Sequence, residues 1–277
     1  MLRTVTLAFG LVLVCAAARA EMILGSAHAI VVDESTGEVL LHKDELTAAP
    51  MASLTKLMTV MVVIDARQDP AEELRIDESD RDHLKRSHGG VPVDAVVSRG
   101  ALIELAVIAS DNRAAAALAR NHPGGLNGFQ SAMRHKIAAL GLVDTLIEEP
   151  TGLSSNNRSS ARDLIKVLRA AADYEPIARV TSQRSHSVIV NGRPWVVRNT
   201  NTLVGAPGWT ILLSKTGFTN EAGHCLGMRV QTGGRTVVIV LMGAARTSMS
   251  RRDALNIRRW LAARAPVVAE PDAMAHL

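Results

Sequence analysis

The spacing of apolar residues changes twice along this chain, and that change limits the folds open to it. Short apolar runs at residues 28–32 and 38–42, separated by a polar segment that ends in Gly37, are typical of a β-hairpin. Apolar residues then recur at helical spacing through the middle of the chain, and short β-rich runs return in the last third. Strands at both ends of a helical middle predict an α+β fold. We expect an antiparallel sheet flanked by helices, in which the first hairpin joins the last strands.

The same patterns predict the individual elements. We expect helices at residues 53–66, 100–109, 112–120, 128–139 and 252–264, and a further helix that begins at Ser160. Strands are expected at residues 187–190, 195–198, 210–214, 224–230 and 236–242. The last helix places Ala254, Ile257 and Leu261 on one side, so we expect that side to pack on the sheet.

The first 20 residues predict a secretory signal peptide, and therefore an exported, periplasmic protein. Arg3 precedes an apolar run over residues 5–18, and Ala-Arg-Ala at 18–20 is a small-x-small cleavage pattern. A retained membrane anchor is an alternative, although the run is shorter than the ~20 residues that a spanning helix needs. A lipoprotein anchor through Cys15 is another.

The mature chain is expected to be one domain at residues 21–265, followed by an unstructured tail at 266–277. After removal of the signal peptide, Cys225 is the only cysteine, so no internal disulfide supports the fold. Cys225 lies in an apolar run, where we expect it to pack in the core. The C-terminal helix is basic, but no strong membrane anchor is expected after the signal peptide.

Composition argues against several classes of function. The surplus of 31 Lys and Arg over 27 Asp and Glu is too small to predict a nucleic-acid-binding surface, and 3 Trp, 1 Tyr and 3 Phe offer little base stacking. The nine histidines form no H-E-x-x-H motif, and the cysteines are not paired, so we expect no metal site. A Gly-rich phosphate loop is also missing. We therefore expect no cofactor.

Ser53 and Lys56 form the first candidate site. A three-residue offset on a helix places hydroxyl and amine on one face, about 5–6 Å apart at Cβ, as nucleophile and base require. Many such pairs are only a helix cap followed by a surface lysine. Lys56, however, is the only charge between Ser53 and Ile64 in an apolar helix, so we expect it to be buried and functional. A protonated lysine is a poor base, so the pair also predicts a second lysine nearby.

Two further motifs provide polar groups. Lys215-Thr216-Gly217 follows the strand expected at 210–214 and offers a cation, a hydroxyl and a glycine that a substrate backbone can approach, although an isolated motif of this kind also fits a simple strand end. Ser110-Asp111-Asn112 lies in a short break between two apolar helices. Two alternatives, Ser154-Ser155-Asn156 and Ser155-Asn156-Asn157, lie in a long polar loop, so we prefer Ser110 and Asn112.

Together, and in this order, the three motifs resemble the set found in penicillin-binding proteins and class A β-lactamases. Over nearly all of its mature length the chain resembles the D-alanyl-D-alanine carboxypeptidase and endopeptidase family of low-molecular-mass penicillin-binding proteins, and it looks closest to the endopeptidase branch. The segments that carry the likeness are Ala52–Thr59, Ser110–Ala116, Glu149–Ser154, Arg198–Asn201 and Leu213–Asn220. The resemblance implies a β-lactamase/transpeptidase-like fold. It also implies a serine DD-peptidase that acts on peptidoglycan muropeptides and is inhibited covalently by β-lactam antibiotics.

The resemblance implies catalytic roles for Ser53, Lys56 and Ser110. Lys56, kept partly neutral by Lys215 and by burial, takes the proton of Ser53, which attacks a D-alanyl carbonyl and forms an acyl-enzyme. Ser110 relays a proton to the leaving amine. Water then hydrolyses the ester.

The substrate-binding residues implied by the resemblance are Asn112, Lys215, Thr216, Gly217, Phe218 and Arg251. Asn112 is expected to hold the substrate amide, and Lys215 and Thr216 the carboxylate beside the scissile bond. The backbone N–H of Phe218 is expected to form an oxyanion hole with that of the nucleophile. Arg251 is a further candidate for the carboxylate, or else an ordinary arginine on a helix face.

Two departures from the family pattern leave alternatives open. Residues 86–93 differ from what the endopeptidase branch leads us to expect beside the site, and Asp111 stands where Glu is more common. Substrate preference therefore stays open between endopeptidase and carboxypeptidase. A serine β-lactamase with Glu149 as general base is a rival interpretation, unless Glu149 only supports its loop. A non-catalytic penicillin-binding module is another.

Overall fold

The computed structural model describes residues 22–85 and 90–264. The expected signal peptide and the expected tail at 266–277 lie outside the described residues. The strands are β1 (His28–Asp33), β2 (Val39–Lys43), β3 (Ala49–Pro50), β4 (Glu73–Arg75), β5 (Val96–Ser98), β6 (Arg158–Ser159), β7 (Ser185–Val190), β8 (Arg193–Arg198), β9 (Thr210–Thr219), β10 (Gly223–Thr232) and β11 (Arg235–Ala244). The helices are α1 (Thr55–Asp65), α2 (Arg99–Ile108), α3 (Asn112–Arg120), α4 (Gly125–Ala139), α5 (Ala161–Ala172), α6 (Glu175–Thr181) and α7 (Thr247–Ala262), with 3₁₀ turns η1 (Ala52–Leu54) and η2 (Glu78–Asp80).

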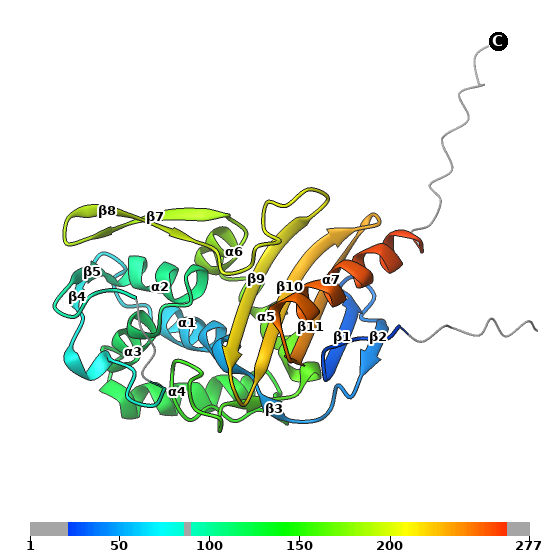
Figure 1. The fold of residues 1–277 in the computed structure, drawn as a ribbon. Coiled ribbons are helices and arrows are strands. Elements are labelled where there is room, and N and C mark those ends of the chain that lie inside the picture. Colours follow the sequence, from blue (N-terminus) through cyan, green and yellow to red (C-terminus); the bar gives the residue numbers. More distant parts are fainter. Residues whose placement is uncertain (1–21, 86–89, 265–277) are drawn as a thin grey trace, which may run out of the picture.

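The main sheet is antiparallel and has the strand order β2-β1-β11-β10-β9. β1 pairs with β11, from His28 opposite Met242 to Asp33 opposite Val237, so the two ends of the described chain meet inside the sheet. The prediction that the first hairpin joins the last strands is therefore confirmed (Figure 1). β9 forms one edge of the sheet and lies beside the helical part of the molecule.

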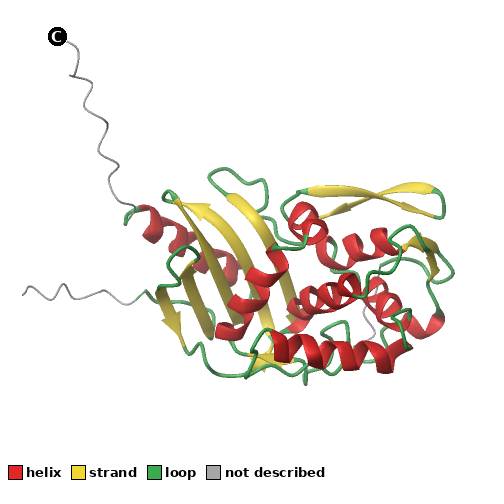
Figure 2. Ribbon diagram, turned by 180° about the vertical axis from the view of Figure 1, so that it is seen from behind, coloured by secondary structure: helices red, strands yellow, loops and turns green. Residues whose placement is uncertain are grey.

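Different helices bury the two faces of the sheet. Alternate residues of β1 enter two separate apolar cores, Val31 on the side of α7 and Ile30 on the other side. Ile257 and Leu261 of α7 are buried against β10 and β11, which confirms the expected packing of the last helix. α5 covers the opposite face and α6 packs on β9, while the other helices lie to the side of the sheet, as the view from behind shows (Figure 2).

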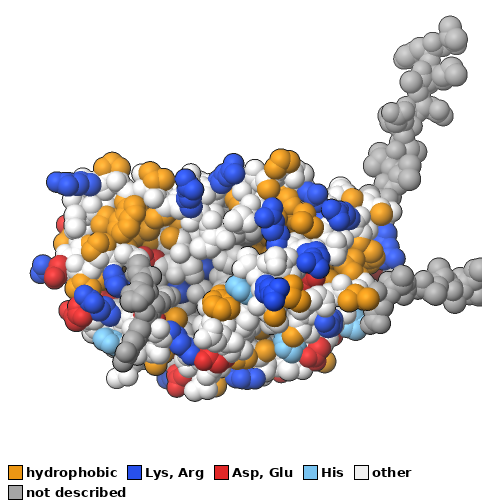
Figure 3. Space-filling view, in the orientation of Figure 1, with side chains coloured by type: hydrophobic (Ala, Val, Ile, Leu, Met, Phe, Trp, Pro, Cys, Tyr) orange, Lys and Arg blue, Asp and Glu red, His pale blue; other side chains and the backbone are white. Residues whose placement is uncertain are grey.

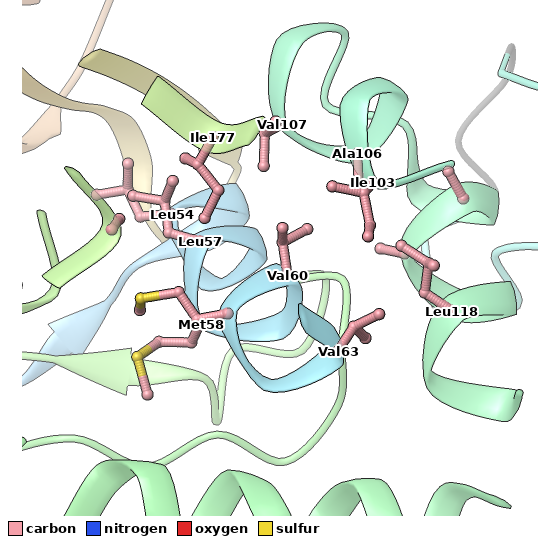
Figure 4. Packing of buried hydrophobic residues seen from close by; sticks show 14 of the residues in the cluster. Leu54, Leu57, Met58, Val60, Val63, Ile103, Ala106, Val107, Leu118 and Ile177 are labelled. Carbon is pink, nitrogen blue, oxygen red and sulfur yellow. The ribbon is translucent and has the colours of Figure 1, made fainter. Parts of the chain in front are cut away.

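α1 lies in the middle of the helical part and is buried on all sides. Residues Thr55–Val63 are all buried, because the sequence offers small or apolar side chains on nearly every face of the helix. Figure 4 shows Val63 of α1 packed among Ile103 of α2 and Leu118 of α3. This helix therefore carries Lys56 into the core, as its isolated charge predicted.

Several elements differ from expectation. β9 was expected to end at residue 214 but continues to Thr219, so residues 215–217 lie inside the strand and not after its end. Their polar side chains interrupt the apolar pattern, which an edge strand next to a cavity permits. β7 and β8 pair with each other as a separate hairpin. α4 begins earlier than expected, at Gly125, and α6, with Pro176 in its first turn, was not predicted.

Candidate active site

Ser53 and Lys56 are in direct contact. Ser53 lies in the 3₁₀ turn η1, one residue before the N-cap of α1, and not in the first turn of the α-helix as expected. A 3₁₀ turn that runs into a helix still places residues three apart on the same side. Lys56 Nζ lies 2.9 Å from Ser53 Oγ. The predicted pairing of hydroxyl and amine is therefore present in the structure.

The Lys56 amine is enclosed by protein. The residue is fully buried, and its Nζ donates to Asn112 Oδ1 at 2.7 Å and to the Thr151 carbonyl at 2.5 Å. Burial lowers the pKa of Lys56 to about 8, although the negative charges of Glu149 and Asp111, and more weakly Asp82, oppose the shift. About a tenth of the amine is therefore neutral at pH 7, and a neutral amine can accept a proton.

Lys215 is a second buried amine next to the first. Its Nζ donates to Ser110 Oγ at 2.8 Å and to the Thr216 carbonyl at 2.9 Å. Burial lowers the pKa of Lys215 well below its usual value, and the charge of Lys56 lowers it further. The expected neighbouring lysine is thus found. Burial, more than repulsion from Lys215, is what lowers the pKa of Lys56.

The break between α2 and α3 directs two polar side chains toward these amines. Ser110 has a positive φ of 61°, a left-handed conformation that turns the chain between the helices. Asp111 caps α3 by accepting from Ala114 N at 3.0 Å, and it also accepts from Val91 N at 2.8 Å. As a result Ser110 reaches Lys215, and Asn112 reaches Lys56.

The alternative triplets at residues 154–157 bond within their own loop and, among the hydrogen bonds of the described residues, do not contact the two buried amines. Ser154 Oγ donates to the Glu148 carboxylate at 2.5 Å, and the Asn157 side chain holds the loop together through Glu148 and Glu149. The geometry therefore favours Ser110 and Asn112 as the polar residues of the site.

Gly217 allows β9 to approach the nucleophile. A β-carbon at this position would lie 2.8 Å from Ser53 N and 3.0 Å from Ala52 Cβ. We expected this glycine to make room for a substrate backbone, but in the structure the space is taken by the backbone of η1. The close contact sets the edge of β9, including Phe218, against the segment that carries Ser53.

A cavity of about 450 Å³ opens in front of these groups. Among the residues that line it are the predicted Ser53, Ser110, Asn112, Thr216, Gly217, Phe218 and Arg251. Lys56 and Lys215 lie beneath this wall and are bonded to residues in it. Lys215, which we expected to bind a carboxylate directly, is thus buried behind the surface of the cavity.

Arg251 and Phe218 stand at the side of the cavity that faces α7. Arg251 is exposed and lies inside α7, and Figure 3 shows Lys and Arg side chains gathered over this helix. The ring of Phe218 is half exposed and stacks on His224 with 4.3 Å between ring centroids. This side of the cavity therefore combines a positive charge with an aromatic wall.

Sequence reasoning gave no role to three other residues of the site. Thr200 lines the cavity and accepts a hydrogen bond from the Thr216 hydroxyl, with 2.6 Å between the oxygens. Thr151 supplies the carbonyl to Lys56, and His224 supports Phe218. Thr200 and Thr151 lie in segments that carried the family likeness, which was the only signal for them.

Comparison with known proteins assigns the chain to a family. The family model described as D-alanyl-D-alanine carboxypeptidase matches the chain over residues 15–246. The chain belongs to the D-alanyl-D-alanine carboxypeptidase family. The resemblance inferred from the three motifs is therefore confirmed.

Relatives within the D-alanyl-D-alanine carboxypeptidase family cover most of the chain. The D-alanyl-D-alanine endopeptidase of Pseudomonas aeruginosa is 41% identical over 240 residues, which are 86% of this chain and 77% of that protein. The D-alanyl-D-alanine endopeptidase of Escherichia coli is 40% identical over the same shares. The crystal structure of the Streptomyces K15 DD-transpeptidase matches 88% of this chain and 99% of its own, with a TM-score of 0.80 at 22% identity. That likeness confirms the expected transpeptidase-like fold.

The described residues offer neither a metal-binding cluster nor a membrane-spanning helix. No group of three or more His, Cys, Asp or Glu side chains in residues 22–85 and 90–264 is arranged to hold a metal ion. Within the same ranges, none of the helices has the length and apolar character needed to cross a membrane. Cys225 is buried in the core and burial raises the pKa of its thiol to about 11, in keeping with a packing role.

Proposed function

We propose that this protein is a serine DD-peptidase that hydrolyses D-alanyl peptide bonds of peptidoglycan through an acyl-enzyme on Ser53. The observation that carries the proposal is the 2.9 Å contact between Ser53 Oγ and the buried amine of Lys56. A hydroxyl becomes a useful nucleophile only when a base can take its proton, and Lys56, with a pKa of about 8, is such a base. Membership in the D-alanyl-D-alanine carboxypeptidase family supports the choice of D-alanyl substrates.

Acylation begins at the neutral Lys56 amine. Lys56 Nζ takes the hydroxyl proton of Ser53 as Oγ bonds to the D-alanyl carbonyl carbon. The backbone N–H groups of Ser53 and Phe218 donate to the developing oxyanion, and each such donor contributes about 3 kcal/mol in comparable enzymes. Asn112, which lines the cavity, binds the substrate amide.

Breakdown of the intermediate releases the amine. As the C–N bond breaks, the Ser110 hydroxyl gives its proton to the leaving nitrogen and is reprotonated from the adjacent lysine pair. Thr216 and Arg251 bind the carboxylate next to the scissile bond, while buried Lys215 acts through Ser110. Water then attacks the ester carbonyl, loses a proton to the lysine pair, and Ser53 regains its hydroxyl proton.

We propose that the preferred substrate is a D-alanyl cross-link and that the protein works in the periplasm after export. The endopeptidases at 41% and 40% identity support this preference, and the family description makes carboxypeptidase activity the second candidate. Both reactions use the same acyl donor and differ in the leaving amine. Purified cross-linked dimer and uncross-linked pentapeptide muropeptides, digested side by side, separate them. Faster release of monomer from the dimer supports the endopeptidase, and faster loss of terminal D-alanine contradicts it.

The geometry disfavours one of the two remaining rivals, and an assay separates the other. A serine β-lactamase needs a carboxylate free to activate water over the ester, whereas the Glu149 oxygens are occupied by hydrogen bonds within their own loop. A non-catalytic penicillin-binding module would be acylated through the same contact between Ser53 and Lys56, so it is the assay on muropeptides that separates it from a peptidase. Penicillin labelling without any release from muropeptides would support such a module, and rapid turnover of a chromogenic cephalosporin would support the β-lactamase.

A further inference from the structure

The loop at residues 148–157 is built around one carboxylate. Glu149 accepts six hydrogen bonds, from Thr151 N and Oγ1, Gly152 N, Leu153 N, Ser154 N and Asn157 Nδ2, at distances of 2.6 to 3.2 Å. A carboxylate that accepts several N–H groups fixes the backbone that carries them. Glu149 therefore determines the course of this loop.

The same loop is fastened to the nucleophile segment on both sides of Ser53. Asn157 accepts from Met51 N through its carbonyl at 3.0 Å, and its side chain donates to Thr55 Oγ1 at 3.3 Å. Gly152 packs so tightly that a β-carbon there would lie 2.0 Å from the Ala52 carbonyl oxygen. A shift of the loop would thus be transmitted to the active site.

The loop also fixes the orientation of the Lys56 amine. A neutral lysine has two N–H bonds and one lone pair. Lys56 Nζ has three oxygens within hydrogen-bond distance, on Asn112, Thr151 and Ser53. The Thr151 carbonyl and Asn112 Oδ1 can only accept, so they take the two N–H bonds. The lone pair is then left facing the Ser53 hydroxyl, which is the direction that proton abstraction requires.

We propose that Glu149 is a positioning residue for Lys56: it holds the Thr151 carbonyl so that the Lys56 lone pair points at Ser53. Two of its hydrogen bonds go to the N–H and the hydroxyl of Thr151 itself. This positioning role rests on the proposed function. It differs from the role of a general base in ester hydrolysis, because Glu149 would act during acylation of Ser53.

Electrostatics gives this role a second signature. Among the charges that act on Lys56, Glu149, Asp111 and Asp82 raise its pKa against the effect of burial, with Glu149 first among the three. The neighbouring amine, Lys215, is buried too, and burial and the charge of Lys56 lower its own pKa. Removing the charge of Glu149 therefore lowers the pKa of Lys56. The acidic limb of the acylation rate, which follows deprotonation of Lys56, should move to lower pH.

The test measures acylation of the full chain by a fluorescent penicillin as a function of pH, with release of the label measured separately. For Glu149→Gln we expect the plateau of the acylation rate to fall by about 10- to 100-fold, the scale on which misplaced catalytic groups act, and the acidic limb to move to lower pH. Glu148→Gln is the matched control, because that exposed carboxylate accepts only from Ser154 Oγ among the described contacts. It should retain the rate and pH profile of the unaltered protein.

A second variant covers the case in which Glu149→Gln does not fold. Thr151→Val keeps the charge of Glu149 and removes the two hydrogen bonds of the Thr151 hydroxyl, the one it donates to Glu149 and the one it accepts from Leu153 N. The plateau should therefore fall while the acidic limb stays in place. The inference is overturned if both variants acylate like Glu148→Gln, or if Glu149→Gln slows release of the label alone, which would identify a base for ester hydrolysis. Failure of the unaltered protein to take the label would overturn the proposed function itself.

Discussion

The backbone of Gly217 on β9 lies so close to the backbone of Ser53 that a β-carbon on Gly217 would be only 2.8 Å from the Ser53 amide nitrogen. Neither partner is a flexible side-chain end, so Gly217→Ala must move the strand or the nucleophile. Displacement of this kind costs about 100-fold in rate. We expect penicillin acylation to fall by that order, measured by stopped-flow fluorescence.

Gly25→Ala provides the matched control for this change. The new methyl would also meet an atom at 2.8 Å, but that atom is the terminal carbon of Met249, which can rotate away. Gly25 does not line the cavity. Equal losses in the two variants would contradict the special role of the contact between Gly217 and Ser53.

Ser53→Ala should abolish both penicillin labelling and hydrolysis of muropeptides, since no other hydroxyl lies next to Lys56 in the required geometry among the described residues. Labelling is read on a gel and hydrolysis by chromatography of the products. Ser155→Ala, in the exposed loop that offered the alternative triplets, should leave both unchanged. Hydrolysis that survives in Ser53→Ala would mean that the nucleophile is another residue.

The acylation rate should rise with pH and level off above about pH 8. Burial lowers the pKa of Lys56 to about 8, and only the neutral amine can take the Ser53 proton, so protonation at lower pH removes the base. The measurement is the second-order rate of penicillin acylation across a pH series. Lys56→Arg retains a cation that does not deprotonate in this range and should be inactive at every pH. A pH-independent rate would argue against Lys56 as the base.

Arg251→Ala should weaken the binding of substrates that carry a carboxylate beside the scissile bond. Charge-assisted hydrogen bonds contribute about 1.5 kcal/mol or more, so KM should rise by about tenfold. A substrate with that carboxylate esterified should be affected far less. Arg252→Ala, the exposed neighbour that does not line the cavity, is the control. Equal effects on acid and ester would rule out direct carboxylate binding by Arg251.

Asp253→Ala should destabilise the fold without changing the chemistry of the site. The buried Asp253 carboxylate accepts from Gly25 N at 3.0 Å and from Ser26 N and Oγ, both at 2.7 Å, and so fastens the start of the described chain to α7. Its loss leaves buried donors unpaired, and we expect a cost of about 3 kcal/mol in the free energy of unfolding. Urea denaturation measures this cost. Exposed Asp173→Ala should change stability by less than about 0.5 kcal/mol.

The sequence predicted the parts of the fold that depend on periodicity. The predicted helix at residues 112–120 has the bounds of α3. The pairing of β1 with β11 followed from the apolar runs in the first and last parts of the sequence. The burial of Lys56 followed from its isolation in an apolar helix. Periodicity failed where function alters it: polar residues inside β9 hid the second half of that strand.

Contacts between distant segments could not be predicted from spacing. The need for glycine at 217 depends on how closely η1 approaches β9, and the carbonyl that Thr151 offers to Lys56 depends on the course of a loop with no regular pattern. Glu149 was recognised only as a possible base or loop residue. Its six hydrogen bonds exist only once the loop has folded around it.

The pairing of β1 with β11 has a consequence for the newborn chain. Because β11 follows β1 by most of the described residues, the sheet cannot close until β11 has been synthesised. In the unfolded chain, Lys56 is an ordinary ammonium ion in water, and Ser53 is as unreactive as any free alcohol. The contact between Ser53 Oγ and Lys56 Nζ, and with it the reactivity proposed for the site, is therefore acquired only on folding.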